Sequence, residues 1–311
     1  MALAEFDLIK RYFAVHAPQH PFNWLGIGDD CALLNPPADY QLAVTTDTMV
    51  ENVHFFADAD PYFLGHKLLA VNLSDLAAMG AEPFAVTLAL TLPIVDETWL
   101  QAFAAGFIGL AQQHHVDLIG GDTTSGPLTL TVQAMGVVPR GGALLRSNAK
   151  VGDLIFVTGQ LGNAGLGLKV THGYVCDDPQ LPLRCFNQPE PRVAEGILLR
   201  EVAHACIDIS DGLGSDLRHI LEQSKVGACL DWERLPMSAQ VRQYIEISGD
   251  WPMPLTAGDD YELCFTLPAE SVPQLPEGCH YVGVIEAEPG LRIVRAGKIE
   301  TFEAKGFEHF S

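Results

Sequence analysis

The sequence predicts an α/β (α+β) protein that folds as two domains, and three observations lead to this prediction. Strand-like and helix-like segments alternate along the whole chain, which is the pattern of repeated βα units. A stretch of proline, arginine and glycine at Pro139–Gly142 interrupts that alternation. The 311 residues, 48% of them hydrophobic, are more than one ordinary core accommodates. We therefore expect a first domain at residues 1–140 and a second domain at residues 150–311.

The first domain is expected to alternate helices and strands from its start. The amphipathic pattern of Phe6–Phe13 predicts a short helix, Pro61 opens a second helix, and Gly80 ends it. Asp96 is the expected N-cap of a third helix, which runs through His114. The strands are expected at Leu42–Val44 running into Thr45–Thr48, at Phe84–Leu92, at Val116–Ile119 with a break at Gly120–Asp122, and at Leu128–Ala134.

The second domain is predicted to contain further αβ elements around one long loop. Four prolines between residues 176 and 191 predict that loop. A glycine-rich stretch, Gly159–Gly167, follows the first strand of this domain. The strands are expected at Leu154–Thr158, Ile207–Ile209, Ala228–Trp232, Tyr261–Leu267 and Tyr281–Val284, with a helix at Leu213–Gln223.

Charge and composition exclude several classes of protein. Acidic residues outnumber Lys and Arg by 39 to 18, so the net charge is −21 and no basic surface for nucleic acid is expected. No apolar run is long enough to cross a membrane, and Met1–Arg11 lacks the pattern of a signal peptide. The seven cysteines are scattered and form no C-x-x-C pair, which argues against disulfides and structural zinc. We expect a cytoplasmic protein with no membrane partner.

The placement of the acidic residues is more informative than their number. Several aspartates follow a glycine or a small hydroxyl residue where a strand is expected to end. These stretches are Gly28–Asp30, Thr45–Thr48, Gly120–Thr124, Ile207–Gly212 and Gly258–Asp260. Any one of them is typical of an ordinary turn, in which aspartate bonds to its own backbone. Together they indicate that carboxylates from distant parts of the chain gather at one site.

Asp75 stands out because of its position in a predicted helix. The apolar face of that helix contains Leu64, Leu68 and Val71, and the same spacing reaches Asp75. An ionised carboxylate that points inward is costly unless it is paired or binds a metal ion. Two interpretations stay open at this point: a metal ligand, or a residue that caps a turn or meets one basic partner.

Clustered carboxylates are the ligands that Mg²⁺ prefers, and Mg²⁺ shares its other positions with substrate phosphates. Without a metal ion, each carboxylate would repel an anionic substrate by about 4 kcal/mol at a separation of about 4 Å. The usual nucleotide motifs are absent. Leu168 stands where a Walker A lysine belongs, and Gly26–Cys31 lacks the third glycine of a dinucleotide-binding loop. The sequence therefore predicts a Mg²⁺-bridged nucleotide or phosphoester site of another kind.

Long motifs follow one another in register along the chain. They are Leu25–Ala32, Thr45–Thr48, Val71–Gly80, Leu118–Thr123, Ile207–Gly212 and Asp260–Leu263. Together these motifs resemble the thiamine-monophosphate kinase family, which belongs to the superfamily of aminoimidazole-ribotide synthetase. The resemblance extends from Phe6 to Phe310 and so covers nearly the whole chain.

The resemblance implies both a fold and a reaction. The fold is the two-domain, aminoimidazole-ribotide synthetase-like fold. It has an N-terminal ferredoxin-like βα domain that binds ATP and Mg²⁺ and pairs with a second subunit as a homodimer. Its C-terminal α/β domain covers the active site. The reaction is the ATP-dependent phosphorylation of thiamine monophosphate to thiamine diphosphate, the last step of thiamine diphosphate biosynthesis, with several Mg²⁺ ions.

The same resemblance implies roles for individual residues. The positions that match metal ligands are Asp30, Thr45, Thr46, Asp47, Asp75, Asp122, Asp208 and Asp211. Those that match nucleotide contacts are Gly121, Asp122, Arg146 and Ser210, and those that match the thiamine-phosphate pocket are His54, Asp259 and Phe307. The family often has glutamate where Asp259 stands and Trp or Tyr where Phe307 stands.

Each assignment has a simpler alternative. Arg146 can be a surface residue, His54 a hydrogen-bonded core or loop histidine, and Phe307 an anchor in the core. For the whole chain, the alternatives are a non-catalytic Mg²⁺–nucleotide sensor and another ATP-dependent enzyme of the superfamily. No catalytic base or nucleophile is expected, because a phosphomonoester is mostly dianionic at neutral pH and can accept a phosphoryl group directly.

Overall fold

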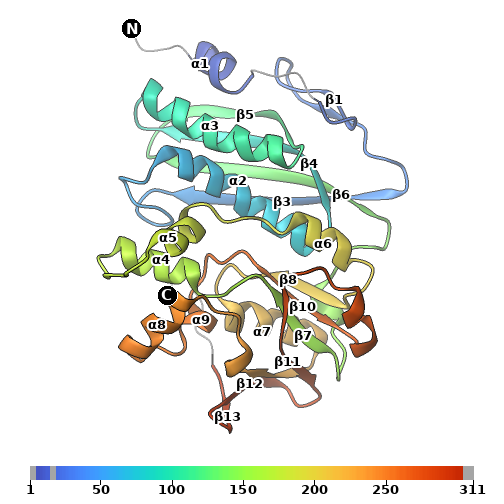
Figure 1. The fold of residues 1–311 in the computed structure, drawn as a ribbon. Helices are drawn as coiled ribbons and strands as arrows, with labels where there is room; N and C mark the ends of the chain where they lie inside the picture. The colour runs from blue at the N-terminus through green and yellow to red at the C-terminus, as the bar shows by residue number, and fades with distance from the viewer. Residues whose placement is uncertain (1–4, 15–18, 304–311) are drawn as a thin grey trace. The chain divides into compact units, whose positions relative to one another are not determined.

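The computed structural model describes residues 5–14 and 19–303 (Figure 1). The chain divides into two compact units, each with its own sheet. The first unit contains the residues up to Leu76 together with Ala81–Gly141, and the second contains Ala77–Gly80 together with the chain from Gly142 onward. Mixed helix and sheet in two units confirms the expected fold class.

The described residues of the first unit form a four-stranded sheet, a two-stranded sheet and three helices. In chain order its elements are α1 (Glu5–Tyr12), β1 (Asn23–Leu25), β2 (Leu33–Leu34), β3 (Tyr40–Val50), α2 (Pro61–Ala78), β4 (Glu82–Leu92), α3 (Glu97–Gln113), β5 (Asp117–Ser125) and β6 (Thr129–Pro139). The larger sheet has the order β3-β6-β4-β5, in which only β4 and β5 are parallel. The helices begin as predicted, and the carboxylate of Asp96 caps α3 by accepting from the backbone of Thr98 and Trp99.

Helices α2 and α3 cover one face of this sheet, as Figure 1 shows. The two helices touch closely, because a Cβ on Gly65 would lie 2.2 Å from the carbonyl oxygen of Phe103, and one on Gly106 would lie 1.9 Å from that of Tyr62. Glycine is therefore required at both positions. Two helices on one face of a four-stranded sheet form the layer arrangement expected of a ferredoxin-like domain.

The opposite face of the same sheet is covered at one end by the segment that contains β1 and β2. Phe22, Ala32 and Leu34 of this segment pack against a small core that includes Phe84 and Val137. Farther along the strands, Thr46 and Thr48 of β3 and Asp122 of β5 are exposed. The two faces of the sheet therefore differ: one is a helix-covered core face, and the other is polar beyond the end that β1 and β2 cover.

The second unit is built on a seven-stranded sheet of order β13-β12-β9-β11-β7-β10-β8, in which only β9 and β12 are parallel. Its strands are β7 (Leu154–Thr158), β8 (Ala205–Asp208), β9 (Gly227–Asp231), β10 (Leu263–Leu267), β11 (Cys279–Glu286), β12 (Gly290–Arg295) and β13 (Lys298–Thr301). Its helices are α4 (Asn163–Thr171), α5 (Gln180–Asn187), α6 (Val193–Leu199), α7 (Leu213–Ser224), α8 (Ala239–Ser248) and α9 (Met253–Thr256). Ile155, Leu217 and Leu230 are among the fully buried residues of its core.

Two local predictions were wrong. The strand that begins at Asp117 does not break at the glycine pair but continues to Ser125. Gly121 has φ +153°, and its backbone passes so close to Leu88 that a Cβ would lie 1.8 Å from the Leu88 oxygen. The glycine serves close strand contact here and not a turn.

The segment between residues 176 and 191, predicted as a loop from its prolines, contains the helix α5. Pro182 lies in the first turn of that helix, where a backbone N–H has no intrahelical acceptor to lose. Pro182 and Phe186 are the buried residues of α5, so one face of the helix packs inward. Among the described residues, no helix is long and apolar enough to cross a membrane.

Candidate active site

Two of the predicted acidic residues of the first unit lie close together. The hydroxyl of Thr45 on β3 donates a short hydrogen bond to the carboxylate of Asp75 on α2. Asp47, two residues along the same strand, points to the same face of the sheet, and the charge of Asp75 raises its pKa. Thr45, Asp47 and Asp75 therefore form one cluster between β3 and α2, which we call the β3–α2 cluster.

The apolar spacing in α2 accounts for the position of Asp75 only in part. Leu64, Leu68 and Val71 are buried as expected, but Leu69 and Leu73 on other sides of α2 are buried as well. The helix is thus surrounded by protein along most of its circumference, and the half-buried Asp75 is one of its more accessible residues. The carboxylate accepts a hydrogen bond from Thr45 on the neighbouring strand β3, and its role as a metal ligand stays a prediction.

Asn72 is a buried polar residue beside the β3–α2 cluster that was not singled out from the sequence. Its side chain is completely buried, its Oδ1 accepts a hydrogen bond from the backbone N–H of Asp47 at 3.2 Å, and its Nδ2 donates to the carbonyl of Leu68 at 2.9 Å. Asn72 therefore fixes the strand segment that carries Asp47 against α2. The signal was present in the sequence, because a buried amide one helical turn before Asp75 needs polar partners.

Burial is the main reason that the pKa of Asp47 is raised to about 6, and the nearby charge of Asp75 adds to it. Both effects oppose two negative charges in this partly buried place. A divalent cation between the carboxylates would reverse the balance, because it favours the ionised form of both. The chemistry of the cluster therefore fits the metal-ligand role predicted for Thr45, Asp47 and Asp75.

His54 lies in the turn that follows β3. The ring Nδ1 of His54 accepts a hydrogen bond from the backbone N–H of Val50 at 2.9 Å. The backbone N–H of His54 donates to the Val50 carbonyl at 2.9 Å. Because Nδ1 is an acceptor, the neutral ring carries its proton on Nε2. The turn thus holds the imidazole at the end of the strand that contains Asp47.

Asp122 lies on the other face of the sheet. It pairs with Ala89 on β4, whose row continues through Thr131 on β6 to Thr48 on β3. Side chains alternate along a strand, so Asp122 points to the face of Thr48 and not to that of Asp47. Three strand spacings of about 4.8 Å also put β5 roughly 14 Å from β3. Thr46, a predicted metal ligand, and Gly121, a predicted nucleotide contact, are exposed on these strands.

Asp30 is exposed in the loop between β1 and β2, where its N–H donates to the Asp29 carboxylate at 2.9 Å. That loop belongs to the segment that packs on the face opposite the helices. Within residues 5–14 and 19–303, no three His, Cys, Asp or Glu side chains lie close enough together to hold a metal ion. One chain therefore gathers Asp47 and Asp75, and convergence of these two with Asp30 and Asp122 stays a prediction.

The second unit places its predicted residues in one turn. Asp208 ends β8 and is buried, and Ser210 and Asp211 follow it before α7 begins. The carboxylate of Asp216 reaches back from the first turns of α7 and accepts hydrogen bonds from the backbone N–H groups of Ser210 and Asp211, both at 3.0 Å. Burial raises the pKa of Asp216 to about 7, with a further contribution from the charge of Asp211.

The loop that carries Asp259 lies beside this turn. The backbone N–H of Asp259 donates to the carbonyl of Ser210 at 2.9 Å, and that of Tyr261 donates to the carbonyl of Ile209 at 2.8 Å. A Cβ on Gly258 would lie 2.2 Å from the Ser210 oxygen, so only glycine permits this contact. The hydroxyl of Tyr261 donates to the Asp259 carboxylate at 3.0 Å.

Asp260, next to the predicted pocket residue Asp259, binds the backbone at the start of α4. Its carboxylate accepts hydrogen bonds from the backbone N–H groups of Gly162 at 2.8 Å and Ala164 at 3.4 Å, at the start of α4. Burial raises the pKa of Asp260 above its ordinary value, and these two donors oppose the rise. The carboxyl group of Asp260 therefore provides the acceptor for backbone N–H groups at the start of α4, and the protein's own side chain fills this part of the glycine-rich stretch.

Of the remaining predicted residues, Arg146 begins a short 3₁₀ helix and is exposed. Its positive charge is near enough to Asp216 to lower the pKa of that carboxyl group. Phe307 lies outside the described residues. Asp216, which the sequence analysis did not single out, could have been found from its place five residues after Asp211 in the first turns of the next helix.

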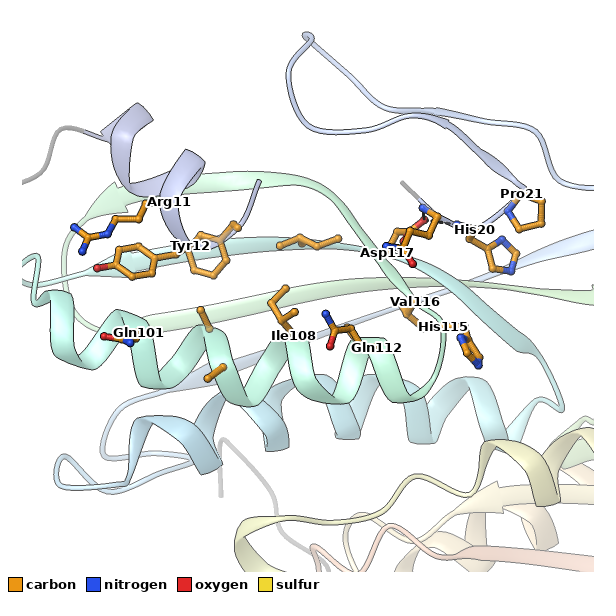
Figure 2. A pocket seen from close by; sticks show the side chains of 16 residues that line it. Arg11, Tyr12, His20, Pro21, Gln101, Ile108, Gln112, His115, Val116 and Asp117 are labelled. Carbon is orange, nitrogen blue, oxygen red and sulfur yellow. Dashed lines mark hydrogen bonds between the residues drawn. The ribbon is translucent and has the colours of Figure 1, made fainter. Parts of the chain in front are cut away.

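A cavity of about 590 Å³ lies in the first unit (Figure 2). Its walls come from α1, from the face of α3 that carries Ile108 and Gln112, and from the chain around His20 and Asp117. None of the predicted metal, nucleotide or substrate residues lines it.

Comparison with known proteins places the chain in a family. The model of the family "AIR synthase related protein, N-terminal domain" matches residues 28–138. The thiamine-monophosphate kinase of Escherichia coli (strain K12) is 45% identical over 323 aligned residues, which cover 100% of this chain and 99% of that protein. The chain belongs to the thiamine-monophosphate kinase family. The resemblance drawn from the sequence motifs is thereby confirmed.

Solved structures of this family have the same fold. The crystal structure of thiamine-monophosphate kinase from Stenotrophomonas maltophilia K279a is 44% identical, with a TM-score of 0.84 and coverage of 94% of this chain and 97% of that one. A structure described as AaThiL complexed with AMPPCP and TMP is 28% identical, with a TM-score of 0.81 and coverage of 100% and 99%. Family members thus share both the sequence and the fold of this chain over nearly its full length.

Proposed function

We propose that this chain catalyses the ATP-dependent phosphorylation of thiamine monophosphate to thiamine diphosphate. The observation that carries the proposal is the full-length match to thiamine-monophosphate kinase at 45% identity. A structural relative bound to AMPPCP, an ATP analogue, and to TMP supports the same pair of substrates at a TM-score of 0.81. The reaction is a direct, in-line transfer of the γ-phosphoryl group to a phosphate oxygen.

The residues present suit an acceptor that needs no base. A phosphomonoester is mostly dianionic at neutral pH, so its oxygen is already a nucleophile. The obstacle is the approach of one polyanion to another, and the site must position both and neutralise their charge. Mg²⁺ would supply that neutralisation by binding phosphate oxygens of both substrates.

Magnesium fits the β3–α2 cluster by the chemistry of its donors. Asp47 and Asp75 supply carboxylate oxygens, Thr45 supplies a hydroxyl beside them, and the raised pKa of Asp47 reports the cost of two negative charges in one place. One ion would be held there, and other ions would be held by Asp30, Thr46 and Asp122, of which Thr46 and Asp122 lie on the opposite face of the sheet. In the second unit, Asp208 and Asp211 would hold further ions, and Arg146 and Ser210 would bind phosphate oxygens.

For thiamine monophosphate, we propose His54 and Asp259 as pocket residues, with Phe307 as an aromatic partner of the positively charged thiazolium ring. Asp259 supports this role because its carboxylate is oriented by the Tyr261 hydroxyl and its backbone is tied to the turn of Ser210. Within the second unit, Asp259 and the turn of Ser210 are therefore neighbours.

We also propose that the protein works as a homodimer in the cytoplasm. The first-unit sheet has β3 and β5 at its two edges, and Leu42 and Val44 of β3 are 47% and 51% exposed. Exposed apolar side chains on an edge strand favour pairing with a second copy. Such pairing would add donors of a second sheet to the exposed face that holds Thr46 and Asp122. The described cysteines are free, which suits a reducing compartment.

The test is an assay of the purified chain with ATP, Mg²⁺ and thiamine monophosphate. We expect ADP to be released in step with thiamine diphosphate, and neither product to form when the acceptor or Mg²⁺ is omitted. Nucleotide binding without turnover would favour a sensor, and turnover with a different acceptor would favour another enzyme of the superfamily. Light scattering should give twice the 33.7 kDa of one chain, and an active monomer would contradict the dimer.

A further inference from the structure

We propose that Asp216 is a positioning residue that couples the nucleotide side of the site to the acceptor side through the turn of Ser210 and Asp211. The inference rests on the proposed function for the roles of Ser210, Asp211 and Asp259. Asp216 itself belongs to none of the sets of predicted ligands. It acts through backbone groups, and it contacts neither substrate.

The first step is the grip of Asp216 on the turn. Its side chain is 3% exposed, and one oxygen, Oδ2, accepts both the Ser210 N–H and the Asp211 N–H at 3.0 Å. Two consecutive backbone groups held by one buried oxygen leave the peptide between them little freedom. Because these hydrogen bonds fix the backbone of Ser210 and Asp211, they also fix the directions in which the two side chains leave it.

The second step is the other end of the turn. Gly212 has φ +104°, and a Cβ there would lie 2.9 Å from the Leu255 carbonyl oxygen. Packing against the chain around Leu255 therefore fixes the residue that leads into α7. With β8 on one side and Gly212 on the other, the hydrogen bonds to Asp216 hold the remaining part of the turn.

The third step is the link to the acceptor side. The Ser210 carbonyl accepts the Asp259 N–H at 2.9 Å, and Gly258 lies directly on that carbonyl. Asp216 thus holds the N–H of Ser210, while the C=O of the same residue holds the backbone of Asp259. A rotation of this turn would move the nucleotide contacts and the acceptor contact together.

The geometry separates hydrogen bonding from charge. Since both donors meet the same oxygen, Asp216→Asn can present its single amide oxygen to both of them and keep the grip without the charge. Asp216→Leu keeps a similar volume and removes the acceptor. We expect Asp216→Asn to stay within about threefold of the wild type in kcat. We expect kcat of Asp216→Leu to be about 10–100-fold lower, which is the usual effect of removing a residue that orients the binding residues of a site. We also expect KM to rise for both ATP and thiamine monophosphate.

Two comparison sets make the test specific. In the first unit, Asp117 Oδ2 also accepts two consecutive backbone N–H groups, of Gln19 and His20, each at 2.8 Å. Asp117→Leu should lower the melting temperature and leave both KM values unchanged. Tyr261→Phe removes the hydroxyl that orients Asp259, so it should raise KM for thiamine monophosphate and leave KM for ATP unchanged.

The measurements are steady-state kinetics, melting temperature, and calorimetric binding of AMPPCP with Mg²⁺. The proposal would be overturned if a folded Asp216→Leu protein had the kinetic constants of the wild type. It would also be overturned if kcat and KM changed as much in Asp216→Asn as in Asp216→Leu. If the wild type showed no kinase activity, the proposed function would fail by itself. The binding of AMPPCP then tests the role of Asp216. Asp216→Leu should bind AMPPCP more weakly than Asp216→Asn does. Equal AMPPCP binding by both variants, or a wild type that binds none, would overturn the inference.

Discussion

The hydroxyl of Thr45 donates a hydrogen bond to the carboxylate of Asp75 and thereby joins an edge strand to the most enclosed helix of the first unit. The hydrogen bond orients the Asp75 carboxylate beside Asp47, and the charge of Asp75 helps to raise the pKa of Asp47. A serine or threonine hydroxyl beside two carboxylates is a set of hard oxygen donors, which is what Mg²⁺ requires. The contact therefore gives the proposed metal site a structural core.

Asp75→Asn is predicted to abolish most activity without unfolding the protein. The Thr45 hydroxyl can still donate to the amide oxygen, so the contact between β3 and α2 survives. The loss of a ligand charge should lower kcat by at least about 100-fold and raise the Mg²⁺ concentration needed for half-maximal rate. Turnover measured over a Mg²⁺ series checks this.

Asp60→Asn is the matched control for Asp75→Asn. Asp60 precedes the same helix, accepts the backbone N–H of Tyr62 at 2.9 Å and lies outside the β3–α2 cluster. Its replacement should leave the Mg²⁺ dependence as in the wild type. If Asp75→Asn also left that dependence unchanged, Asp75 would not be a metal ligand.

Two glycines of α3 are predicted to respond to alanine in opposite directions. Nothing lies within 4 Å of a Cβ on Gly109, so Gly109→Ala should stabilise the exposed helix position by about 1 kcal/mol. A Cβ on Gly106 would lie 1.9 Å from the Tyr62 oxygen, so Gly106→Ala should force α2 and α3 apart and destabilise the unit. Urea unfolding of both variants measures the two free energies, and a shift of the same sign in both would refute the close helix contact.

Periodic and capped elements could be predicted from the sequence, because local chemistry alone determines them. The helix after Asp96 begins and ends as expected, since its cap and its apolar face lie within the segment itself. The family and the fold class also followed from the order of the motifs. The strand through Gly121 could not be predicted in this way, because glycine is required there by the close contact with Leu88 on another strand.

The candidate site could be predicted as a set of residues but not as a geometry. The sequence indicated Asp47 and Asp75 without their pairing, which depends on how β3 packs on α2. Asn72 and Asp216 were missed because each acts on a distant or preceding backbone group. The place of Asp122 on the opposite face from Asp47 follows from strand register, which no motif reports.

His20 is predicted to make stability fall at acidic pH. Burial lowers its pKa from 6.5, although the charges of Glu82 and Asp117 oppose this, and its Nδ1 accepts the Phe22 N–H at 3.4 Å. The folded state thus favours the neutral ring. The unfolded chain binds the proton more readily, so this contribution is complete above about pH 6.5 and is lost as the pH falls below it.

The check is a comparison of wild type with His20→Gln by urea unfolding at about pH 7.5 and about pH 5. The wild type should lose more of its free energy of unfolding over this range than the variant does. Parallel loss in the two proteins would show that His20 is not the group responsible.

Glu262→Gln is predicted to cost about 1.5–3 kcal/mol of stability, because it removes the charged acceptor of a largely buried ion pair and leaves Arg192 with its longer pair to Glu195, at 3.8 Å. The Glu262 carboxylate accepts from Arg192 Nε at 2.7 Å and Nη2 at 2.6 Å, and from the Thr158 hydroxyl at 2.6 Å. This pairing raises the pKa of Arg192 well above its usual value in the wild type. The guanidinium stays charged in the variant as well, because arginine is protonated at neutral pH even without an acidic partner. The exposed pair of Glu222 and Arg218, 3.6 Å apart, provides the control. Glu222→Gln should change the free energy of unfolding by less than about 1 kcal/mol. Equal, small effects in the two variants would mean that Glu262 is not held by a buried ion pair, and the link between β7 and the chain before α6 would then need another explanation.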